Sequence, residues 1–166
     1  LITGGAGYIG SKLTTKLLNL NYNVTVIDTL RFSKTSLNHL FIYKNFQFVK
    51  GDIRNKKLMN KLIKSNEFII PLAALVGAPL CDKNKKEAIS INLASIKYLM
   101  KNINNKNKII YLTTNSGYGI GEKNKYCDEK SPLNPISLYG RTKVEAEKII
   151  MKSKNSIAFR LATVFG

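Results

Sequence analysis

The sequence predicts an α/β domain built on a doubly wound parallel sheet. Short β-branched or apolar runs alternate along the chain with segments whose apolar residues recur at helical spacing. A glycine-rich loop, residues 3–10, separates the first apolar run from the first helical segment. Two later runs, residues 67–74 and 108–113, are continuously apolar or nearly so, which is typical of parallel strands buried on both faces. The 166 residues, 44% of them hydrophobic, suffice for one domain with a buried core.

This alternation divides the chain into six expected strands and four expected helices. The first strand is expected to be the end of a truncated longer one, and the six strands cover residues 1–3, 23–28, 46–50, 67–74, 108–113 and 156–161. The helices are expected at residues 8–20, in the lysine-rich stretch after Asp52, at 86–103 and at 137–152. Their inward-facing residues are Ile9, Leu13, Leu17 and Leu18, then Leu58, Leu62 and Ile63, then Ile89, Leu93, Ile96 and Leu99 or Met100. Strands that alternate with helices predict right-handed crossovers within one parallel sheet.

The net charge of +17 does not by itself indicate a nucleic-acid-binding protein. The basic residues are 23 Lys and only 4 Arg, and they are scattered along the whole chain. Proteins that read nucleic acids usually gather arginines and aromatic residues on one face. We therefore expect no nucleic-acid partner, and a salt-sensitive DNA-binding protein remains an alternative.

The sequence also argues against a membrane protein, a disulfide framework and a metal site. No stretch approaches the ~18 consecutive apolar residues of a membrane span, and no signal peptide is visible. Two cysteines, Cys81 and Cys127, cannot form a disulfide framework or a four-ligand zinc site. The single histidine, His39, lies outside every motif, and the acids Asp128, Glu129, Glu145 and Glu147 are expected to be surface charges. We expect a cytoplasmic protein with no metal and no membrane partner.

The glycine loop predicts a site for a dinucleotide. Gly4 permits a tight turn, Gly7 lets a pyrophosphate approach the backbone, and Gly10 permits close packing of the following helix. The helix N-terminus adds free N–H groups and a positive dipole end. Asp28 ends the second strand, 24 residues after Gly4, near the offset expected for an acid that binds ribose.

Asp28 also bears on the choice of cofactor. A carboxylate accepts hydrogen bonds from a ribose 2′-hydroxyl and repels a 2′-phosphate, so we expect NAD rather than NADP. Arg31 and Lys34 lie close behind and leave accommodation of a phosphate open.

A second constellation is the pair Tyr139 and Lys143. Residues four apart lie on one face of a helix, and an ammonium beside a phenol lowers the phenol's pKa from ~10 toward the range of a general base. A Tyr–Lys pair on a solvated helix is the simpler alternative. The buried strand that ends in Thr113 and Thr114 and the dinucleotide loop favour the catalytic interpretation.

Further segments complete a family pattern: residues 51–54 (GDIR), residues 72–74 (LAA), Asn92, residues 113–119 (TTNSGYG) and residues 160–166 (RLATVFG). With the glycine loop and the Tyr139–Lys143 pair, they resemble the extended short-chain dehydrogenases/reductases. Within these, they resemble the NAD-dependent epimerase/dehydratase group that acts on nucleotide sugars. The resemblance covers nearly the whole chain and implies a Rossmann fold. Residues 1–166 are then its N-terminal NAD-binding domain, without the C-terminal substrate lobe.

The resemblance also implies the site residues. The catalytic residues are expected to be Thr114, Tyr139 and Lys143. The residues expected to bind NAD are Gly4, Gly7, Tyr8, Ile9, Gly10, Asp28, Asp52, Ile53, Leu72, Ala73, Ala74, Asn92, Tyr139 and Lys143. Asn92 corresponds to a structural residue near the active site.

The sequence departs from the family at two places. Pro71 replaces a histidine common before the LAA turn. Asn115 and Ser116 stand where sugar 4,6-dehydratases carry an Asp–Glu pair, so the acid and base for eliminating water are missing and dehydratase activity is disfavoured.

The resemblance therefore implies an NAD-dependent nucleotide-sugar epimerase-like enzyme. It would oxidise a sugar hydroxyl, at C4, to a transient keto sugar and re-reduce it. Two alternatives remain: an NAD(P)-dependent sugar or other ketoreductase of the same fold, and a non-catalytic dinucleotide-binding protein. A homodimer through the helices at residues 86–103 and 137–152 is also expected.

Overall fold

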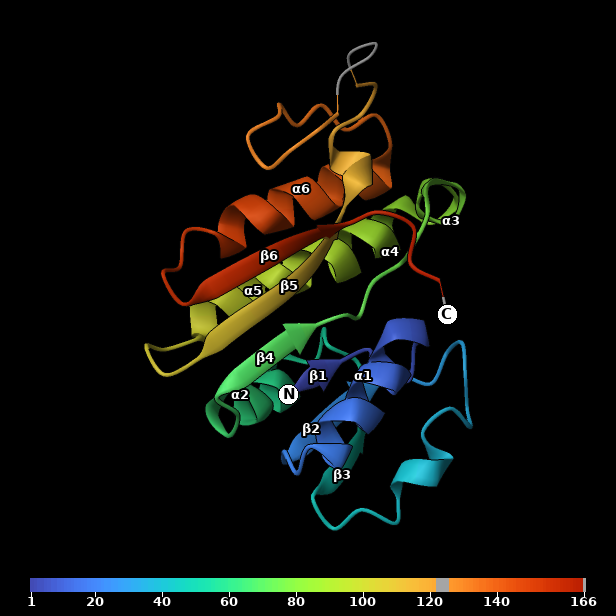
Figure 1. Cartoon of the computed structure of the whole chain (residues 1–166), viewed down its shortest axis with the longest axis vertical. Coiled ribbons are helices and arrows are strands. Elements are labelled where there is room, and N and C mark those ends of the chain that lie inside the picture. The colour runs from blue at the N-terminus through green and yellow to red at the C-terminus, as the bar shows by residue number, and fades with distance from the viewer. Residues whose placement is uncertain (122–125, 166) are drawn as a thin grey trace.

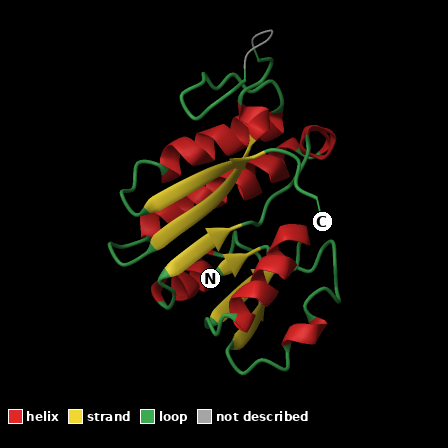
Figure 2. Cartoon of the chain, viewed as in Figure 1, coloured by secondary structure: helices red, strands yellow, loops and turns green. Residues whose placement is uncertain are grey.

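The computed structural model describes residues 1–121 and 126–165, and these form one parallel six-stranded sheet with helices on both faces (Figure 1, Figure 2). The strands are Ile2–Thr3 (β1), Val24–Asp28 (β2), Phe46–Lys50 (β3), Phe68–Pro71 (β4), Lys108–Thr114 (β5) and Ser156–Leu161 (β6). The helices are Tyr8–Asn19 (α1), Lys56–Lys64 (α2), Ala78–Lys83 (α3), Lys85–Ile89 (α4), Ser95–Asn102 (α5) and Leu138–Ile150 (α6). The predicted doubly wound fold is confirmed.

The order of the strands indicates where a ligand can bind at the edge of the sheet. It is β3-β2-β1-β4-β5-β6, so the chain winds outward from β1 to β3, returns to β4 beside β1, and winds outward again to β6. This is the Rossmann order, and ligands of such sheets bind at the carboxyl ends of the strands where the winding reverses. A ligand site is therefore expected between the ends of β1 and β4.

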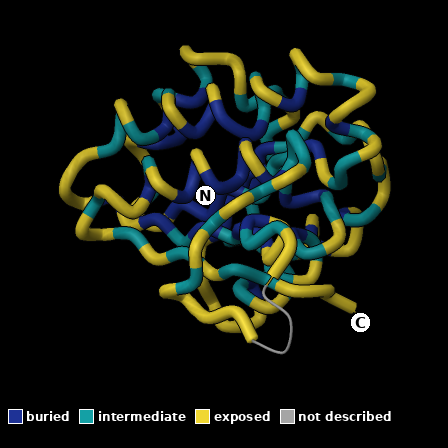
Figure 3. Tube along the Cα trace, turned by 90° about the horizontal axis from the view of Figure 1, so that it is seen from above, coloured by how far each residue is buried: buried dark blue, intermediate teal, exposed yellow. Residues whose placement is uncertain are grey.

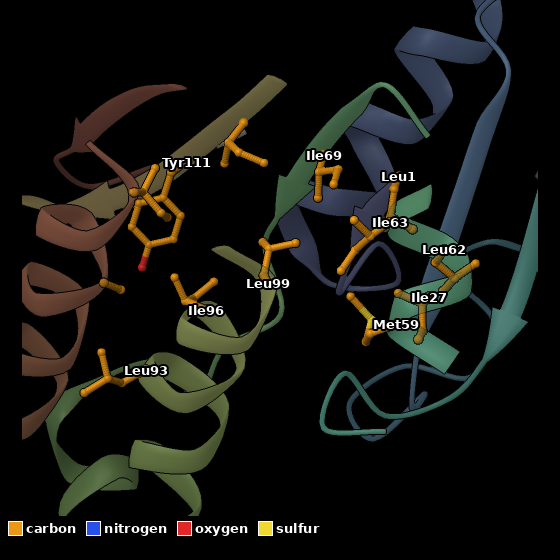
Figure 4. Close-up of a cluster of buried hydrophobic side chains, with 13 residues drawn as sticks. Leu1, Ile27, Met59, Leu62, Ile63, Ile69, Leu93, Ile96, Leu99 and Tyr111 are labelled. Carbon is orange, nitrogen blue, oxygen red and sulfur yellow. The ribbon is translucent and has the colours of Figure 1, made fainter. Parts of the chain in front are cut away.

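Alternating side chains along the strands build a core on each face of the sheet. On β4, Ile69 packs in a cluster with residues from α2, α5 and α6, whereas Ile70 packs in a second cluster with residues from α1. Figure 4 shows Leu99 of α5 and Ile63 of α2 in the first cluster, together with Tyr111 of β5. Buried residues accordingly run through the middle of the domain, and exposed residues lie on its outer turns (Figure 3).

The segment at residues 75–103 differs most from the sequence prediction. A single helix was expected at residues 86–103, but α4 and α5 are joined by a π-helical turn, Ser90–Ala94, and an additional short helix, α3, precedes them. A π turn adds a residue to the helix, so residues before and after it no longer share one 3.6-residue face. Leu93, Ile96 and Leu99 are buried as predicted, whereas Ile89 is 44% exposed, so its inward placement was wrong.

The other elements agree with the sequence within a few residues. The last strand matches the predicted bounds, 156–161, and Gly166 at the end of the RLATVFG segment lies outside the described residues.

Candidate active site

A cavity of about 900 Å³ opens at the carboxyl ends of the strands, where the two halves of the sheet meet. Its walls come from the glycine loop, the ends of β2, β3 and β5, the segment after β4, and the start of α6. Predicted site residues that line it are Gly4, Gly7, Tyr8, Ile9, Gly10, Asp28, Asp52, Ile53, Leu72, Ala73, Ala74, Thr114, Tyr139 and Lys143. The fold therefore gathers residues from six separate segments around one space.

The glycine loop is shaped by close backbone contacts. Gly4 has φ +71°, and a Cβ on it would lie 2.6 Å from the backbone of Ala73. A Cβ on Gly10 would lie 2.6 Å from the carbonyl oxygen of Gly4. Gly7 is the N-cap of α1 and provides no side-chain cap, so the end of this helix can receive an anionic group such as a pyrophosphate.

Asp28 is held in place by the backbone around it. Its Oδ2 accepts a hydrogen bond from the Ala6 N–H at 3.0 Å, and its Oδ1 accepts one from the Leu30 N–H at 2.8 Å. A carboxylate has about four acceptor positions, so this one can still accept from a ribose hydroxyl.

Two ion pairs lie at the same end of the cavity. The Arg54 guanidinium binds both oxygens of Asp52, with Nε at 2.9 Å from Oδ1, and these hydrogen bonds hold the pKa of that carboxyl below its usual value. Arg31, on the loop after β2, pairs with Glu87 of α4 at 2.8 Å. All four residues line the cavity, and the sequence had singled out only Asp52 as a site residue.

Asn92 is the predicted cofactor-binding residue that does not line the cavity. It is buried in the π turn, where its Oδ1 accepts from the Leu75 N–H at 2.8 Å and its Nδ2 donates to the Leu75 carbonyl at 2.9 Å. Asn92 thus fixes the backbone of Leu75, which itself lines the cavity. This agrees with the structural role that the resemblance implies for Asn92, whereas its side chain is not among those that line the cavity, where the NAD-binding residues were expected.

Two of the three predicted catalytic side chains, Tyr139 and Thr114, contact each other on the wall formed by β5 and α6. Burial raises the pKa of the Tyr139 phenol, and a hydrogen bond with Thr114 acts in the opposite direction. Thr114 Oγ1 also donates to the Ser116 hydroxyl at 3.1 Å, and Ser116 lines the cavity as well. The group can therefore present hydroxyls to a bound substrate oxygen.

Lys143 is deeply buried behind this wall. Its Nζ donates to the Leu112 carbonyl at 2.7 Å and lies 4.1 Å from the centre of the Tyr111 ring. Burial lowers the pKa of this ammonium to about 7, and the nearby Glu147 carboxylate partly opposes the shift. The predicted lowering of the Tyr139 pKa is wrong for this structure, because burial dominates both groups and raises the pKa of the phenol.

A buried ion pair supports the same helix and was missed in the sequence. Glu147, expected at the surface, is 6% exposed, and its Oε1 accepts from Nε and a terminal nitrogen of Arg160 at 2.9 and 2.7 Å. Arg160 also donates to the Tyr118 hydroxyl at 3.2 Å. The four-residue spacing of Tyr139, Lys143 and Glu147 was the available signal, because it places all three on one helix face.

Within residues 1–121 and 126–165, no group of three or more His, Cys, Asp or Glu side chains is arranged to hold a metal ion. Likewise, none of the helices described is both long and apolar enough to cross a membrane.

Comparisons with known proteins agree with this fold and show the family to which the chain belongs. The sequence matches the model of the "NAD dependent epimerase/dehydratase family" over residues 1–166, and the chain belongs to this family. A relative from Methanocaldococcus jannaschii named "Putative UDP-glucose 4-epimerase" is 36% identical over 90% of this chain and 49% of its own length. The dTDP-D-glucose 4,6-dehydratase of Dictyostelium discoideum is 30% identical over 99% of this chain and 42% of its own length.

A similar solved structure is UDP-glucuronic acid 4-epimerase from Bacillus cereus in complex with NAD. It superposes with a TM-score of 0.86 at 29% identity, over 99% of this chain and 56% of the other. The chain thus spans about half the length of the curated relatives it matches.

Proposed function

We propose that residues 1–166 are the NAD-binding domain of a nucleotide-sugar epimerase-like enzyme that oxidises and re-reduces a sugar hydroxyl at C4. The observation that carries this proposal is that Thr114, Tyr139 and Lys143 line the same cavity as the glycine loop and Asp28. The family match and the relatives named as 4-epimerases support it.

The residues present fit NAD. Gly4 and Gly10 let the glycine loop pack closely against the neighbouring backbone, and Gly7, at the uncapped N-terminus of α1, leaves room for a pyrophosphate whose charge suits that helix end. The Asp28 carboxylate would accept from the adenosine ribose, and Asp52 and Ile53 would flank the adenine. Leu72, Ala73 and Ala74 would lie along the cofactor on the opposite wall.

The chain's own residues would handle the proton and the position of the sugar. In its phenolate form, Tyr139 would take the proton from the sugar hydroxyl at Oη and later return it, while Thr114 would hydrogen-bond the reacting oxygen. Lys143, with its pKa of about 7, can gain or lose a proton near neutral pH one helical turn away. NAD held in this cavity would supply the hydride acceptor for oxidation of the sugar carbon and the hydride donor for its re-reduction.

Epimerisation is favoured over dehydration by the residues that follow Thr114. The relatives include a 4,6-dehydratase, so the family match alone leaves both reactions open. Elimination of water needs an additional acid and base, and Asn115 and Ser116 supply neither a carboxylic acid nor a carboxylate. A net ketoreductase of the same fold remains the second candidate.

The test is to incubate the intact protein with UDP-, dTDP-, GDP- and CDP-sugars and to follow product identity and the absorbance of reduced cofactor. An isomeric sugar with no net change in cofactor supports the proposal. Stoichiometric NADH formation or consumption indicates a dehydrogenase or reductase, and a 4-keto-6-deoxy sugar indicates a dehydratase. Binding of NAD without turnover indicates a binding protein.

We propose two further properties on the same basis. The protein acts in the cytoplasm on a nucleotide sugar, without a nucleic-acid or membrane partner. It forms a homodimer through α4, α5 and α6, which analytical ultracentrifugation of the intact protein tests directly.

A further inference from the structure

The ion pair between Arg31 and Glu87 joins the two halves of the domain across the cavity. Arg31 lies three residues after Asp28, on the loop that leaves β2, and Glu87 lies in α4 on the other half of the sheet (Figure 1). Their charged atoms are 2.8 Å apart, and both side chains line the cavity. The pair therefore spans the cavity beside the acid proposed to bind the adenosine ribose.

The end of the cavity near Asp28 differs in net charge from the chain as a whole. Three carboxylates, Asp28, Asp52 and Glu87, face two guanidiniums, Arg31 and Arg54, among its lining residues. Each guanidinium is paired: Arg54 with Asp52, and Arg31 with Glu87. A chain with a net charge of +17 thus presents a net charge of −1 where the adenosine ribose would lie.

We propose that Glu87 is a cofactor-specificity residue that holds Arg31 away from a ribose 2′-phosphate and so makes the site select NAD over NADP. This inference rests on the proposed function, because it requires that a nicotinamide dinucleotide occupies the cavity. An arginine near the ribose acid is the group that accommodates a 2′-phosphate in this type of fold. Arg31 is in the right segment for that contact, and its Nη1 instead donates to the Glu87 carboxylate across the cavity at 2.8 Å.

Asp28 itself repels a 2′-phosphate: both of its oxygens accept backbone N–H groups, from Ala6 and Leu30, so its position is fixed and it cannot turn away. Arg31 would act in the opposite direction if its guanidinium were free to meet the phosphate. Among the described residues, this guanidinium is held by Glu87 and lies over the face of Phe32, which its central carbon approaches to 5.5 Å. Whether this guanidinium meets a 2′-phosphate therefore depends on Glu87.

The experiment measures NAD and NADP binding to the intact protein by isothermal titration calorimetry, which needs no turnover. Glu87→Gln keeps the size of the side chain and removes its charge. We expect the Kd for NADP to fall about 10-fold and the Kd for NAD to change less than about 2-fold, the scale of one charge-assisted contact at a half-exposed site. The gain should shrink as salt is added, because both groups are exposed to solvent.

Two further variants define the cause. Arg31→Gln together with Glu87→Gln should return the NADP Kd to the wild-type value or above it, because the phosphate then has no guanidinium. Glu67→Gln is the matched control: it breaks the surface pair with Lys108, 2.7 Å apart and away from the cavity, and should leave the ratio of the two Kd values unchanged.

The outcomes separate this inference from the proposed function. NAD binding by the wild type with the same NAD/NADP ratio in Glu87→Gln overturns the inference alone. A gain in NADP affinity that persists in the double variant also overturns it, because Arg31 would not be the cause. A wild-type protein that binds neither dinucleotide overturns the proposed function and the inference with it.

Discussion

The half of the sheet made of β1, β2 and β3 shapes the cavity with backbone atoms, whereas the half made of β4, β5 and β6 shapes it mainly with buried side chains. In the first half, Gly4 and Gly10 leave no space for a Cβ, and Asp28 is oriented by two backbone N–H groups. In the second half, Tyr139 and Lys143 stand on α6, and burial moves the pKa of each.

Because of this difference, the two halves should tolerate different amino-acid substitutions. Where backbone atoms form the wall of the cavity, an added side-chain atom disrupts the wall, because the neighbouring backbone must shift to admit it. A wall of buried polar side chains accepts an isosteric change without losing its shape, but it loses the chemistry that the removed atom performed. We call β1, β2 and β3 the backbone half and β4, β5 and β6, with α6, the side-chain half. Substitutions in the backbone half should mainly affect cofactor binding, and substitutions in the side-chain half should mainly affect turnover.

The largest expected effect comes from removing one atom in the side-chain half. Tyr139→Phe deletes the phenolic oxygen and keeps the ring that packs against Leu75 and Cys81. We expect turnover to fall about 10³-fold, the scale of general acid–base catalysis, with the Kd for NAD changed less than about 3-fold. Steady-state kinetics and calorimetry on the intact protein measure the two effects.

Tyr22→Phe is the control for Tyr139→Phe, since Tyr22 is exposed on the turn after α1. Turnover that survives in Tyr139→Phe would remove Tyr139 from the chemistry and leave the side-chain half without its proposed base.

The next largest effect is expected from adding one carbon in the backbone half. Gly4→Ala forces a non-glycine residue to φ +71° and brings its Cβ to 2.6 Å from Ala73. We expect a loss of about 2–4 kcal/mol in the free energy of unfolding and weaker NAD binding, because strain and overpacking add. Urea unfolding and calorimetry measure the losses.

Gly121→Ala provides the comparison, because among the described residues a Cβ there would meet only Cys127 Sγ, at an ordinary contact distance of 3.7 Å. Equal stability of the Gly4→Ala and wild-type proteins would mean that the glycine loop adjusts to the added carbon. It would contradict the idea that close backbone contacts fix the shape of this cavity wall.

The sequence predicted the backbone half better than the side-chain half for a physical reason. The glycine spacing, the β-branched run 23–28 and its terminal acid are local signals, and the structure brings Gly4, Gly7, Gly10 and Asp28 to one cavity. Whether a side chain is buried depends instead on which elements pack against it. Lys143 is buried because α6 lies on β5, and nothing near it in the sequence specifies that contact.

The remaining misses have the same origin. Glu147 was assigned to the surface because its partner, Arg160, is on β6 and becomes a neighbour only when β6 pairs with β5. The π turn at Ser90–Ala94 was missed because periodicity alone does not reveal one inserted residue. Asn92 was recognised through the family pattern, but its bonds to Leu75 could be seen only in the structure.

A smaller effect tests whether the buried ion pair supports the side-chain half. Glu147→Gln keeps an acceptor for Arg160 and removes the negative charge. We expect the free energy of unfolding to fall by about 1–2 kcal/mol, because the Arg160 guanidinium, 18% exposed, loses its counter-ion. Glu145→Gln, on the exposed face of the same helix, should change it by less than about 0.5 kcal/mol. Equal losses in the two variants would mean that the Glu147–Arg160 ion pair contributes no more to stability than an exposed carboxylate does.

The last and smallest effect is a pH dependence that belongs to the side-chain half alone. Burial lowers the pKa of Lys143 from 10.5 to about 7 in the folded protein. Between those values the unfolded chain binds one proton that the folded chain does not, so the contribution of Lys143 to stability rises with pH across that window. Lys143→Met removes this group while preserving most of its length.

The quantity to measure is the free energy of unfolding of Lys143→Met minus that of the wild type, at pH 7, 8 and 9. Groups that do not interact with Lys143 cancel in this difference, and Glu147 and Tyr111, which lie beside the amine, are present in both proteins. We expect the relative advantage of Lys143→Met to shrink by about 1 kcal/mol per pH unit. Lys148→Met, on the exposed face of α6, should give a flat difference. A flat difference for Lys143→Met as well would mean that this amine titrates as it does in water, and that burial does not set the chemistry of this half of the site.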